Sequence, residues 1–315
     1  MSCSPSHLEE LRDAVLSAPR VLCVGAETKP RLSAVEGLRI STRGLRGITE
    51  YEPGEFTFTA LAGTPVREII DALSAQGQYL PFDPMLVDAG STIGGVVASG
   101  LGGPGSFRYG GVRDFILGVR FVDGLGRLLR LGGKVVKNAA GFDVPKFLVG
   151  SLGRFGAIGE VTFKVFPKPG SILTLTKPFQ HGEPARLSRG RFEIDALDAP
   201  PGGETLLVRL AGPGRAIEAL AREIRGEIVD GGIWDQIRET PWGFKSILAP
   251  GEGAAFRRSH LSCGGDVAFS IEPPAHGLAL RGDGPLWIGG RTRFAIEDRV
   301  KEALDPQHRF PSLDD

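Results

Sequence analysis

The 315-residue sequence has few of the side chains that bind metals or form disulfide bonds. Its cysteines, Cys3, Cys23 and Cys263, lie far apart, which indicates neither a disulfide framework nor a CxxC metal site. An iron–sulfur cluster is not expected on this chain, because such clusters usually take four cysteine ligands. The five histidines are also scattered, and no two lie two or four residues apart. We therefore expect no metal site.

Net charge and long apolar runs are lacking as well. Lys and Arg total 37, as do Asp and Glu, so no basic face for nucleic acid is indicated. No apolar run approaches the roughly 18 residues of a membrane-spanning helix, and the polar N-terminus is unlike a signal peptide. The expected location is the cytoplasm. The chain is long enough for two domains, and its neutral charge leaves association with a partner subunit open.

Glycine, in contrast, is abundant between Gly90 and Gly159. Nineteen of these seventy residues are glycine, against roughly 7% in an average protein. Glycine has no Cβ, so a ligand can approach the backbone closely. Exposed backbone N–H groups commonly bind anions such as phosphate. The segment therefore predicts a bound nucleotide cofactor.

Three interpretations of this segment compete. The first is a set of tight turns in a β-rich domain. The second is a Rossmann loop, which needs G-x-G-x-x-G between a strand and a helix. Gly100-Leu101-Gly102 begins such a motif, but Pro104 interrupts the expected helix start, and no GxxxxGK[ST] loop occurs. The third interpretation is a flavin site of a different architecture.

Periodicity outlines the elements of the first half. Ser6 and Glu9 resemble a capping box that opens a helix. The helix after Thr64 has that threonine as its expected N-cap, Pro65 at its first position and Gly77 at its end. Strands are expected at 20–24, from Phe56 to Thr59 and at 161–165, with a hairpin over 115–131 that turns at 123–126.

The run Pro167-Lys168-Pro169-Gly170 marks a predicted domain boundary. Beyond it we expect an α+β module. Its predicted strands lie at 172–176, 206–210 and 267–271, and its predicted helices at 217–224 and 294–304.

Several ordered motifs resemble one known superfamily. They are GSTIGG at 90–95, VVASGLGG at 96–103, YGGVRD at 109–114, GGKVVKNAAGFD at 132–143 and VGSLGRFGAIGEVTFKV at 149–165. This succession is similar to the FAD-binding domain of the vanillyl-alcohol oxidase/p-cresol methylhydroxylase (PCMH) type. Within that superfamily it looks most like the FAD-binding subunit of bacterial glycolate oxidase. The resemblance is strong over residues 20–170 and weak beyond them.

The resemblance implies an α+β fold. Residues 1–168 would form a PCMH-type FAD-binding domain of two α/β subdomains, with FAD extended between them. Residues 169–315 would form a smaller α+β domain of the cap or substrate type. Asp305-Pro306 and Phe310 resemble the turn by which such chains return to the FAD domain.

The resemblance also implies which residues contact FAD. The first loop would cradle the pyrophosphate and comprises Gly25, Ala26, Glu27, Thr28 and Lys29. We expect the Glu27 carboxylate to face away, since it would repel phosphate. The second segment would contact the same group and comprises Gly90, Ser91, Thr92, Gly94 and Gly95. Ser91 or Thr92 is expected to cap a short helix whose free N–H groups face the pyrophosphate.

The remaining expected contacts lie toward the flavin or the adenine. They are Ala98, Ser99, Gly100, Gly141, Asp143, Gly153, Gly156 and Ile158. Lys137-Asn138, beside the flavin motif, forms either a cofactor contact or a solvated turn. Arg113-Asp114 forms either an active pair or a pair that fixes a turn, and the structural alternative is favoured.

No catalytic residue can be assigned. Related enzymes that oxidise 2-hydroxy acids use histidines near a Gly-Asp-Gly-Asn-like segment. Arg281-Gly282-Asp283-Gly284-Pro285 lacks both the preceding histidine and the asparagine, and His276 is expected to be an ordinary loop residue. Because no histidine lies between His7 and His181, the predicted FAD is non-covalent. Trp234, Trp242 and Trp287 are expected in ordinary core packing.

The leading hypothesis from the resemblance is an FAD-binding subunit of a multi-subunit glycolate oxidase, which oxidises glycolate to glyoxylate. Its partners would be a catalytic flavoprotein subunit and an iron–sulfur subunit, through which the complex reaches the inner face of the membrane. This chain would be an electron-relay or structural flavoprotein. The alternatives are a self-sufficient FAD-dependent 2-hydroxy-acid dehydrogenase and a non-catalytic scaffold with a degenerate flavin fold.

Overall fold

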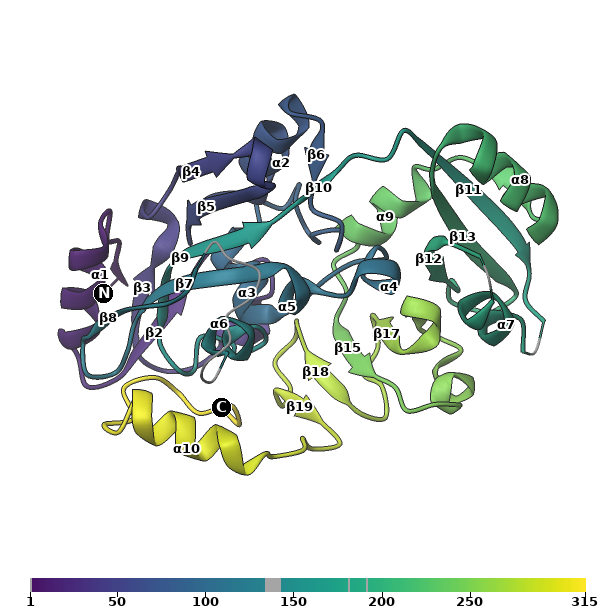
Figure 1. The fold of residues 1–315 in the computed structure, drawn as a ribbon. Helices are drawn as coiled ribbons and strands as arrows, with labels where there is room; N and C mark the ends of the chain where they lie inside the picture. Colours follow the sequence, from purple (N-terminus) through teal and green to yellow (C-terminus); the bar gives the residue numbers. More distant parts are fainter. Residues whose placement is uncertain (1, 134–142, 181, 191) are drawn as a thin grey trace.

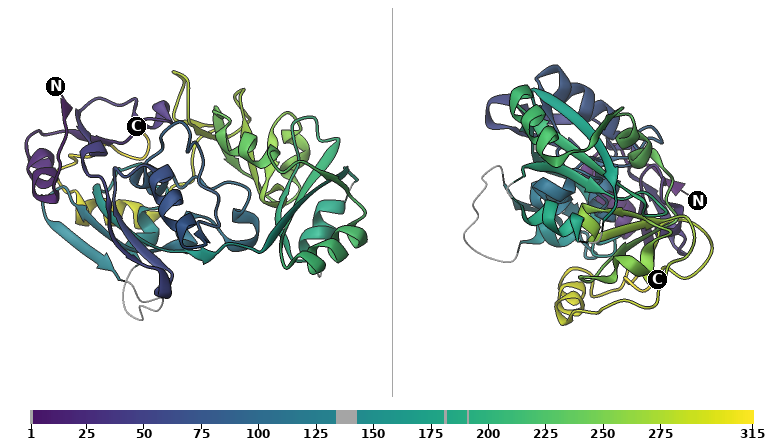
Figure 2. Two further views of the ribbon diagram at one scale, coloured as in Figure 1. Left: turned by 90° about the horizontal axis from the view of Figure 1, so that it is seen from above. Right: turned by 90° about the vertical axis from the view of Figure 1, so that its right-hand side faces the viewer.

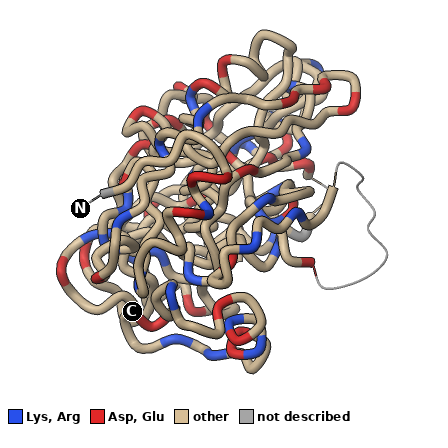
Figure 3. Tube along the Cα trace, turned by 90° about the vertical axis from the view of Figure 1, so that its left-hand side faces the viewer, with Lys and Arg blue, Asp and Glu red and all other residues tan. Residues whose placement is uncertain are grey.

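The computed structural model describes residues 2–133, 143–180, 182–190 and 192–315. Figure 1 shows an elongated molecule with the N-terminal half at the left and a second group of sheets and helices at the right. The last helix and the C-terminus return beneath the N-terminal half (Figures 1 and 2). Basic and acidic residues are interspersed along the chain trace (Figure 3), as the balanced composition requires.

A small parallel sheet begins the chain. Its strands, in spatial order, are β1 (Ser2–Cys3), β3 (Leu38–Ser41) and β2 (Val21–Val24). Helix α1 (Leu8–Leu16) packs beside it, because its apolar residues recur on one face. The predicted capping box is wrong. His7 occupies the N-cap, and the Ser6 amide donates to the Glu10 carboxylate (2.7 Å) rather than to Glu9.

A five-stranded antiparallel sheet forms the larger part of this half. Its strands, in spatial order, are β4 (Ile48–Glu52), β5 (Thr57–Leu61), β9 (Ala157–Lys164), β7 (Ile116–Val122) and β8 (Leu128–Gly132). The predicted hairpin is confirmed as β7 and β8. Asp123 closes its turn, since Oδ1 accepts hydrogen bonds from the amides of Leu125 (3.0 Å) and Arg127 (2.8 Å). Phe56, predicted to begin a strand, instead has a left-handed backbone (φ 55°) just before β5.

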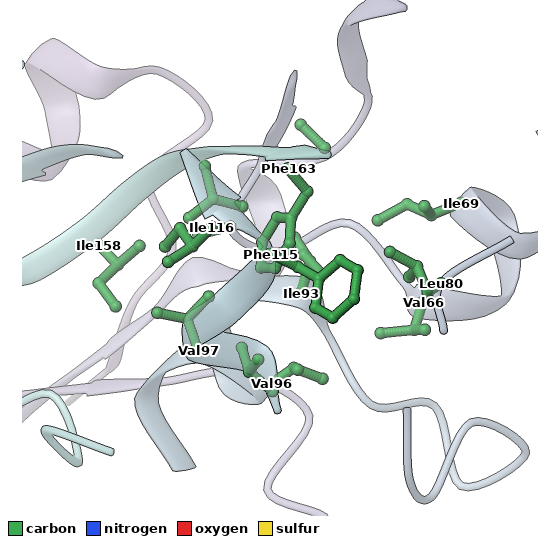
Figure 4. Packing of buried hydrophobic residues seen from close by; sticks show 14 of the residues in the cluster. Val66, Ile69, Leu80, Ile93, Val96, Val97, Phe115, Ile116, Ile158 and Phe163 are labelled. Carbon is green, nitrogen blue, oxygen red and sulfur yellow. The ribbon is translucent and has the colours of Figure 1, made fainter. Parts of the chain in front are cut away.

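Helices cover this sheet and enclose its core. They are α2 (Val66–Ala75), α3 (Ile93–Ser99), α4 (Ser106–Tyr109), α5 (Val112–Phe115) and α6 (Val144–Leu148). Figure 4 shows side chains of α2 and α3 converging on Phe115, Ile116 and Phe163. Helix α2 ends before Gly77 as predicted. Its N-cap is Pro65 rather than Thr64, because the Thr64 hydroxyl donates to the Leu61 carbonyl (2.7 Å).

The chain leaves this half through a short two-stranded pair, β6 (Gln78–Tyr79) with β10 (Phe166–Pro167). An antiparallel sheet follows, with the order β12 (Ile194–Asp198), β13 (Thr205–Gly212), β11 (Ser171–Pro178) and β14 (Glu227–Val229). Helix α8 (Gly214–Ile224) packs on β11 and β13, and α7 (Glu183–Arg189) packs on β12. The predicted apolar stripe of α8 is buried at Ile217, Ala221 and Ile224.

A second antiparallel sheet completes the C-terminal half. Its order is β16 (His260–Ser262), β17 (Val267–Ser270), β15 (Phe244–Ile247), β18 (Gly277–Ala279) and β19 (Trp287–Ile288). Helices α9 (Ile233–Glu239) and α10 (Ala295–Leu304) flank it in sequence. Short 3-10 turns are η1 (Pro30–Ser33), η2 (Thr42–Gly44), η3 (Pro53–Glu55), η4 (Glu252–Phe256) and η5 (Cys263–Gly265). Among the described helices, none combines the length and apolar character needed to cross a bilayer.

The end of the chain returns to the first sheet, as predicted from Asp305 and Phe310. The Val21 amide donates to the Arg309 carbonyl (2.8 Å), and the Asp305 carboxylate accepts the Phe310 amide (2.9 Å). Phe310 is 1% exposed in a core that includes Val21 and Ile40. Residues 304–310 thus pack on the N-terminal half, and the division into 1–168 and 169–315 stays a prediction.

The two halves share a buried junction. One apolar cluster joins Met85, Leu86, Leu101 and Leu152 of the first half to Trp242, Phe269, Leu278, Leu280 and Leu286 of the second. A buried ion network lies nearby, in which Arg209 contacts Asp83 (2.5 Å) and Asp195. These contacts fix the C-terminal half against the first half, and Leu101 and Leu152 adjoin the predicted cofactor residues Gly100 and Gly153.

Candidate functional site

The loop that follows β2 forms one wall of a pocket. Residues 23–29, Leu32 and Ser33 line this wall, and residues of α3 with Leu152 line the opposite side. Within the described part of the chain, the amides of Ala26, Glu27, Thr28 and Lys29 donate to no acceptor. Consecutive unpaired amides around a hollow are binding groups for an anion.

Glu27 lies in this loop with a left-handed backbone (φ 54°). Its carboxylate forms an ion pair with Arg39 and accepts a hydrogen bond from the Ser33 hydroxyl (3.3 Å). Arg39 therefore offsets the negative charge that would otherwise oppose an anion at the loop.

A second pocket adjoins the first. The two share Cys23, Val24, Gly25, Gly95, Ala98 and Leu152. The second pocket continues past Thr42 and Ala62 to Gly94, Gly153, Gly156 and Ile158. Together they form one hollow between the small parallel sheet and the five-stranded sheet, where the sequence predicted an extended cofactor.

Close backbone packing shapes this hollow. Thr92 caps α3, as expected for one of the two candidate residues, because its Oγ1 accepts the Gly95 amide (3.3 Å). A Cβ added at Gly25 would lie 2.5 Å from the same Oγ1. A Cβ added at Gly94 would lie 2.7 Å from Cβ of Ala62. Glycine at these two positions lets the loop and α3 approach their neighbours.

Most amides of residues 90–95, which were expected to face an anion, are bonded within the protein instead. The amides of Gly90 and Ser91 donate to the carbonyls of Val87 (3.0 Å) and Leu86 (3.1 Å). Likewise, the amides of Ile93 and Gly94 donate to the carbonyls of Thr64 (3.0 Å) and Ala62 (2.8 Å). Their packing shapes the wall. Among the described amides of residues 90–95, that of Thr92 donates to no acceptor, so it adds to the unpaired amides of the first loop.

The late loop completes the far wall. The Leu152 amide donates to the Ala98 carbonyl (2.8 Å), which ties this loop to α3. Gly153, Gly156 and Ile158 line the second pocket. Cys23 lies between the two pockets, and burial raises the pKa of its thiol to about 12. The thiol is therefore protonated at neutral pH and is a weak nucleophile.

Other predicted contacts lie outside the hollow. Asp143 is the N-cap of α6, where its Oδ1 accepts the Lys146 amide (3.3 Å), and it lines a separate cavity of about 500 Å³. Gly90, Ser91 and Gly100 flank α3 without lining either pocket. Gly141, together with Lys137, Asn138 and Phe142, lies outside the described residues.

Arg113 and Asp114 do not pair with each other among the described contacts. Oδ2 of Asp114 accepts the Gly111 amide (2.9 Å), which caps α5. Arg113 lines the separate cavity beside Asp143. Asp114 thus fixes a turn, as the structural alternative predicted. It does so by accepting a backbone amide rather than by pairing with Arg113.

Two described histidines of the second half, His260 and His276, are bound to carboxylates. Nε2 of His260 lies 2.8 Å from Oδ2 of Asp198, which also accepts the Ser262 hydroxyl (3.0 Å). His276 is similarly paired with Glu252 (2.8 Å). The residues that line the two pockets include no histidine. A search of the described residues finds no group of three or more His, Cys, Asp and Glu that could hold a metal ion.

Sequence reasoning missed contacts from the second half. Nη2 of Arg281 donates to the Thr28 carbonyl (2.7 Å), and Nζ of Lys245 donates to the Gly100 carbonyl (3.3 Å). Both partners belong to predicted cofactor segments. Arg281 belongs to the Arg-Gly-Asp-Gly-Pro segment described in the sequence analysis. Its contact with Thr28 could not be predicted, because the two residues are 253 positions apart and no local sequence pattern links them.

Comparison with known proteins identifies the family. A family model described as an FAD-binding domain matches residues 2–132. Glycolate oxidase subunit GlcE of Escherichia coli (strain K12) is 33% identical over 333 residues, which cover 96% of this chain and 94% of that protein. The chain belongs to the glycolate oxidase GlcE family. Its cofactor is FAD, and its fold is the predicted α+β fold with a PCMH-type FAD-binding domain.

Other relatives match about half of the chain. Glycolate oxidase subunit GlcD of Bacillus subtilis (strain 168) is 32% identical over 46% of this chain and 31% of its own length. A D-lactate dehydrogenase of Anaerostipes hadrus is 31% identical over 47% of this chain and 30% of its own. Among solved structures, an alkyldihydroxyacetonephosphate synthase superposes with a TM-score of 0.70 over 99% of this chain and 76% of that chain. At 16% identity it shows the fold alone.

The residues of the hollow fit FAD. The first loop offers unpaired amides and Lys29 to a diphosphate, and the wall near Ala62 and Ile158 offers apolar surface to a ring system. Because Gly25 has no Cβ, the first loop can lie close to Thr92 at the start of α3. When bound, FAD supplies a reversible acceptor for electrons.

Proposed function

We propose that this chain is the FAD-binding subunit of a multi-subunit glycolate oxidase, an FAD-dependent 2-hydroxy-acid oxidoreductase that converts glycolate to glyoxylate. The observation that carries the proposal is the similarity to glycolate oxidase subunit GlcE along nearly the full length of both chains. A match confined to the cofactor domain would support the fold without supporting the particular complex.

The proposed cofactor contacts are the predicted residues that the structure brings into the hollow. In the first loop and α3 they are Gly25, Ala26, Glu27, Thr28, Lys29, Thr92, Gly94, Gly95, Ala98 and Ser99. In the late loop they are Gly153, Gly156 and Ile158. Non-covalent attachment is supported by the absence of histidine from both pocket linings and by the protonated thiol of Cys23.

The proposed partners are a catalytic flavoprotein subunit that carries the glycolate site and an iron–sulfur subunit that accepts electrons. Oxidation of a 2-hydroxy acid needs a base for the hydroxyl proton. The buried His260 is already bound to Asp198, which also accepts the Ser262 hydroxyl, and His276 is bound to Glu252. Neither histidine lines either pocket, which supports an electron-relay or structural role for the chain. Its proposed location is the cytoplasm, with membrane association through the partners.

The test compares the chain alone with the co-expressed complex. The purified chain should be yellow, and acid precipitation should leave the flavin in the supernatant. Glycolate:dye reductase activity should be absent from the isolated chain and present in the complex. Strong activity from the chain alone would indicate a self-sufficient dehydrogenase instead. A colourless chain that takes up no added FAD would indicate a scaffold.

A further inference from the structure

A turn of the C-terminal half is hydrogen bonded to the first loop of the cofactor site. Nη2 of Arg281 donates to the Thr28 carbonyl (2.7 Å). The Arg31 amide donates to the Leu280 carbonyl (3.1 Å), and Nε of Arg31 donates to the Gly284 carbonyl (2.7 Å). Three hydrogen bonds therefore hold residues 280–284 against residues 28–31, which include two of the unpaired amides.

Two cations meet at this contact. Lys29 is 8% exposed, lines the pocket, and donates from Nζ to the Thr28 hydroxyl (3.1 Å). Among the described residues, no carboxylate forms a hydrogen bond or ion pair with Lys29 or Arg281, and the buried Nε of Arg281 has no acceptor. Burial, and then repulsion from Arg281, lower the pKa of Lys29 to about 8. A buried cation beside a half-buried one, with no counterion, is in an unfavourable position until an anion joins them.

The nearest carboxylate in the sequence does not neutralise this pair. Glu27 is two residues from Lys29, but its carboxylate is bound to Arg39 and the Ser33 hydroxyl. The missing negative charge must therefore come from a ligand in the pocket that Lys29 lines. An organic diphosphate has the charge for two cations and the acceptors for the unpaired amides of residues 26–29.

We propose that Lys29 binds the FAD diphosphate through its ammonium group and that Arg281, from the C-terminal half, is the positioning residue that holds the loop and adds positive charge. The proposal rests on the proposed FAD site and extends it. The diphosphate site is built from both halves of the chain, and the Arg-Gly-Asp-Gly segment serves the cofactor rather than a substrate.

The test measures FAD affinity by fluorescence quenching, with ADP and adenosine as competitors, in the full-length chain. Arg281→Met removes the hydrogen bond and the charge, and Arg281→Gln keeps a donor for Thr28. Loss of the positive charge and of the hydrogen bond that holds the loop should weaken the binding of FAD and ADP about 10- to 100-fold. Adenosine lacks the diphosphate and should be unaffected, so the preference for ADP over adenosine should collapse. The FAD affinity of Arg281→Gln should be closer to that of Arg281→Met than to that of the wild type, because glutamine keeps a donor but lacks the positive charge.

Arg258→Met is the matched control, because this arginine of the same half is 91% exposed and pairs with Glu272 (3.5 Å). It should leave all three affinities unchanged. An unchanged ADP-to-adenosine ratio in Arg281→Met, or an equal loss for both competitors, would overturn the proposal. A wild-type chain that binds neither FAD nor ADP would overturn the FAD site itself, which is a distinguishable result.

Discussion

Gly25→Ala tests whether FAD binding requires contact between the first loop and α3. The added Cβ would lie 2.5 Å from Oγ1 of Thr92, whereas ordinary contacts begin near 3.4 Å. Thr92 cannot yield freely, because this oxygen caps α3 by accepting the Gly95 amide (3.3 Å). The substitution must therefore push the loop away from the helix or break the cap.

The magnitude follows from these two outcomes. A lost N-cap costs about 1 kcal/mol, and an overpacked contact costs about 1–3 kcal/mol. We expect Gly25→Ala to lower the free energy of unfolding by about 2 kcal/mol. Because the displaced loop carries the unpaired amides and Lys29, FAD affinity should fall about tenfold or more, equivalent to about 1.4 kcal/mol.

A double-mutant cycle identifies the cause. Thr92→Ala removes the oxygen that the new Cβ would meet. Thr92→Ala should therefore lower the free energy of unfolding less in the Gly25→Ala variant than in the wild type, with a coupling energy of about 1 kcal/mol. Urea unfolding and FAD titration of the four proteins measure both effects. Gly54→Ala is the control, since its Cβ would meet nothing within 4 Å. If the two substitutions lowered the free energy of unfolding additively and left FAD affinity unchanged, a clash between the new Cβ and Thr92 would be refuted as the cause.

Three further predictions test the charge at Lys29, the C-terminal return and the junction. FAD affinity should fall as pH rises above about 8, because free Lys29 deprotonates there while a bound anion raises its pKa. Lys29→Arg places at this position a cation with a pKa above about 12, so it should flatten the profile, and a flat wild-type profile would contradict this. Phe310→Ala should lower the free energy of unfolding by about 3–5 kcal/mol, and a loss below about 1 kcal/mol in urea would contradict its core position. Asp83→Asn breaks the buried Arg209 network and should cost about 3–5 kcal/mol, whereas Asp235→Asn, 70% exposed, should cost under about 0.5 kcal/mol by the same measurement.

The sequence predicts helices and strands well where several residues follow the same hydrophobic or turn pattern. The stripe of α8, the hairpin of β7 and β8 and the end of α2 before Gly77 all rest on several residues that agree. Helix starts are less predictable, because a single hydroxyl has several acceptors or donors within reach. Thr64 donates to Leu61 instead of capping α2, and Ser6 meets Glu10 one residue beyond the predicted Glu9.

The candidate site could be predicted in its location and only partly in its chemistry. Glycine-rich segments indicated which backbones approach each other, and the residues from Gly25 to Lys29 and several from Thr92 to Ser99 do line one hollow. The pattern could not show which amides remain unpaired. That depends on the carbonyls of Ala62 and Thr64, which occupy the amides of Gly94 and Ile93. The partners of these groups are set by tertiary packing.

The C-terminal half contacts two of the segments that were predicted to hold the cofactor. Arg281 donates to the Thr28 carbonyl of the first loop, and Lys245 donates to the Gly100 carbonyl after α3. A ligand that requires both walls in place therefore also favours the docked arrangement of the two halves, by the same free energy with which docking favours the ligand. At a concentration 100 times its Kd, FAD would add about 2.7 kcal/mol to the stability of the docked chain. Under this proposal the second half supports the cofactor site from outside, since its residues contact the predicted segments but line neither pocket.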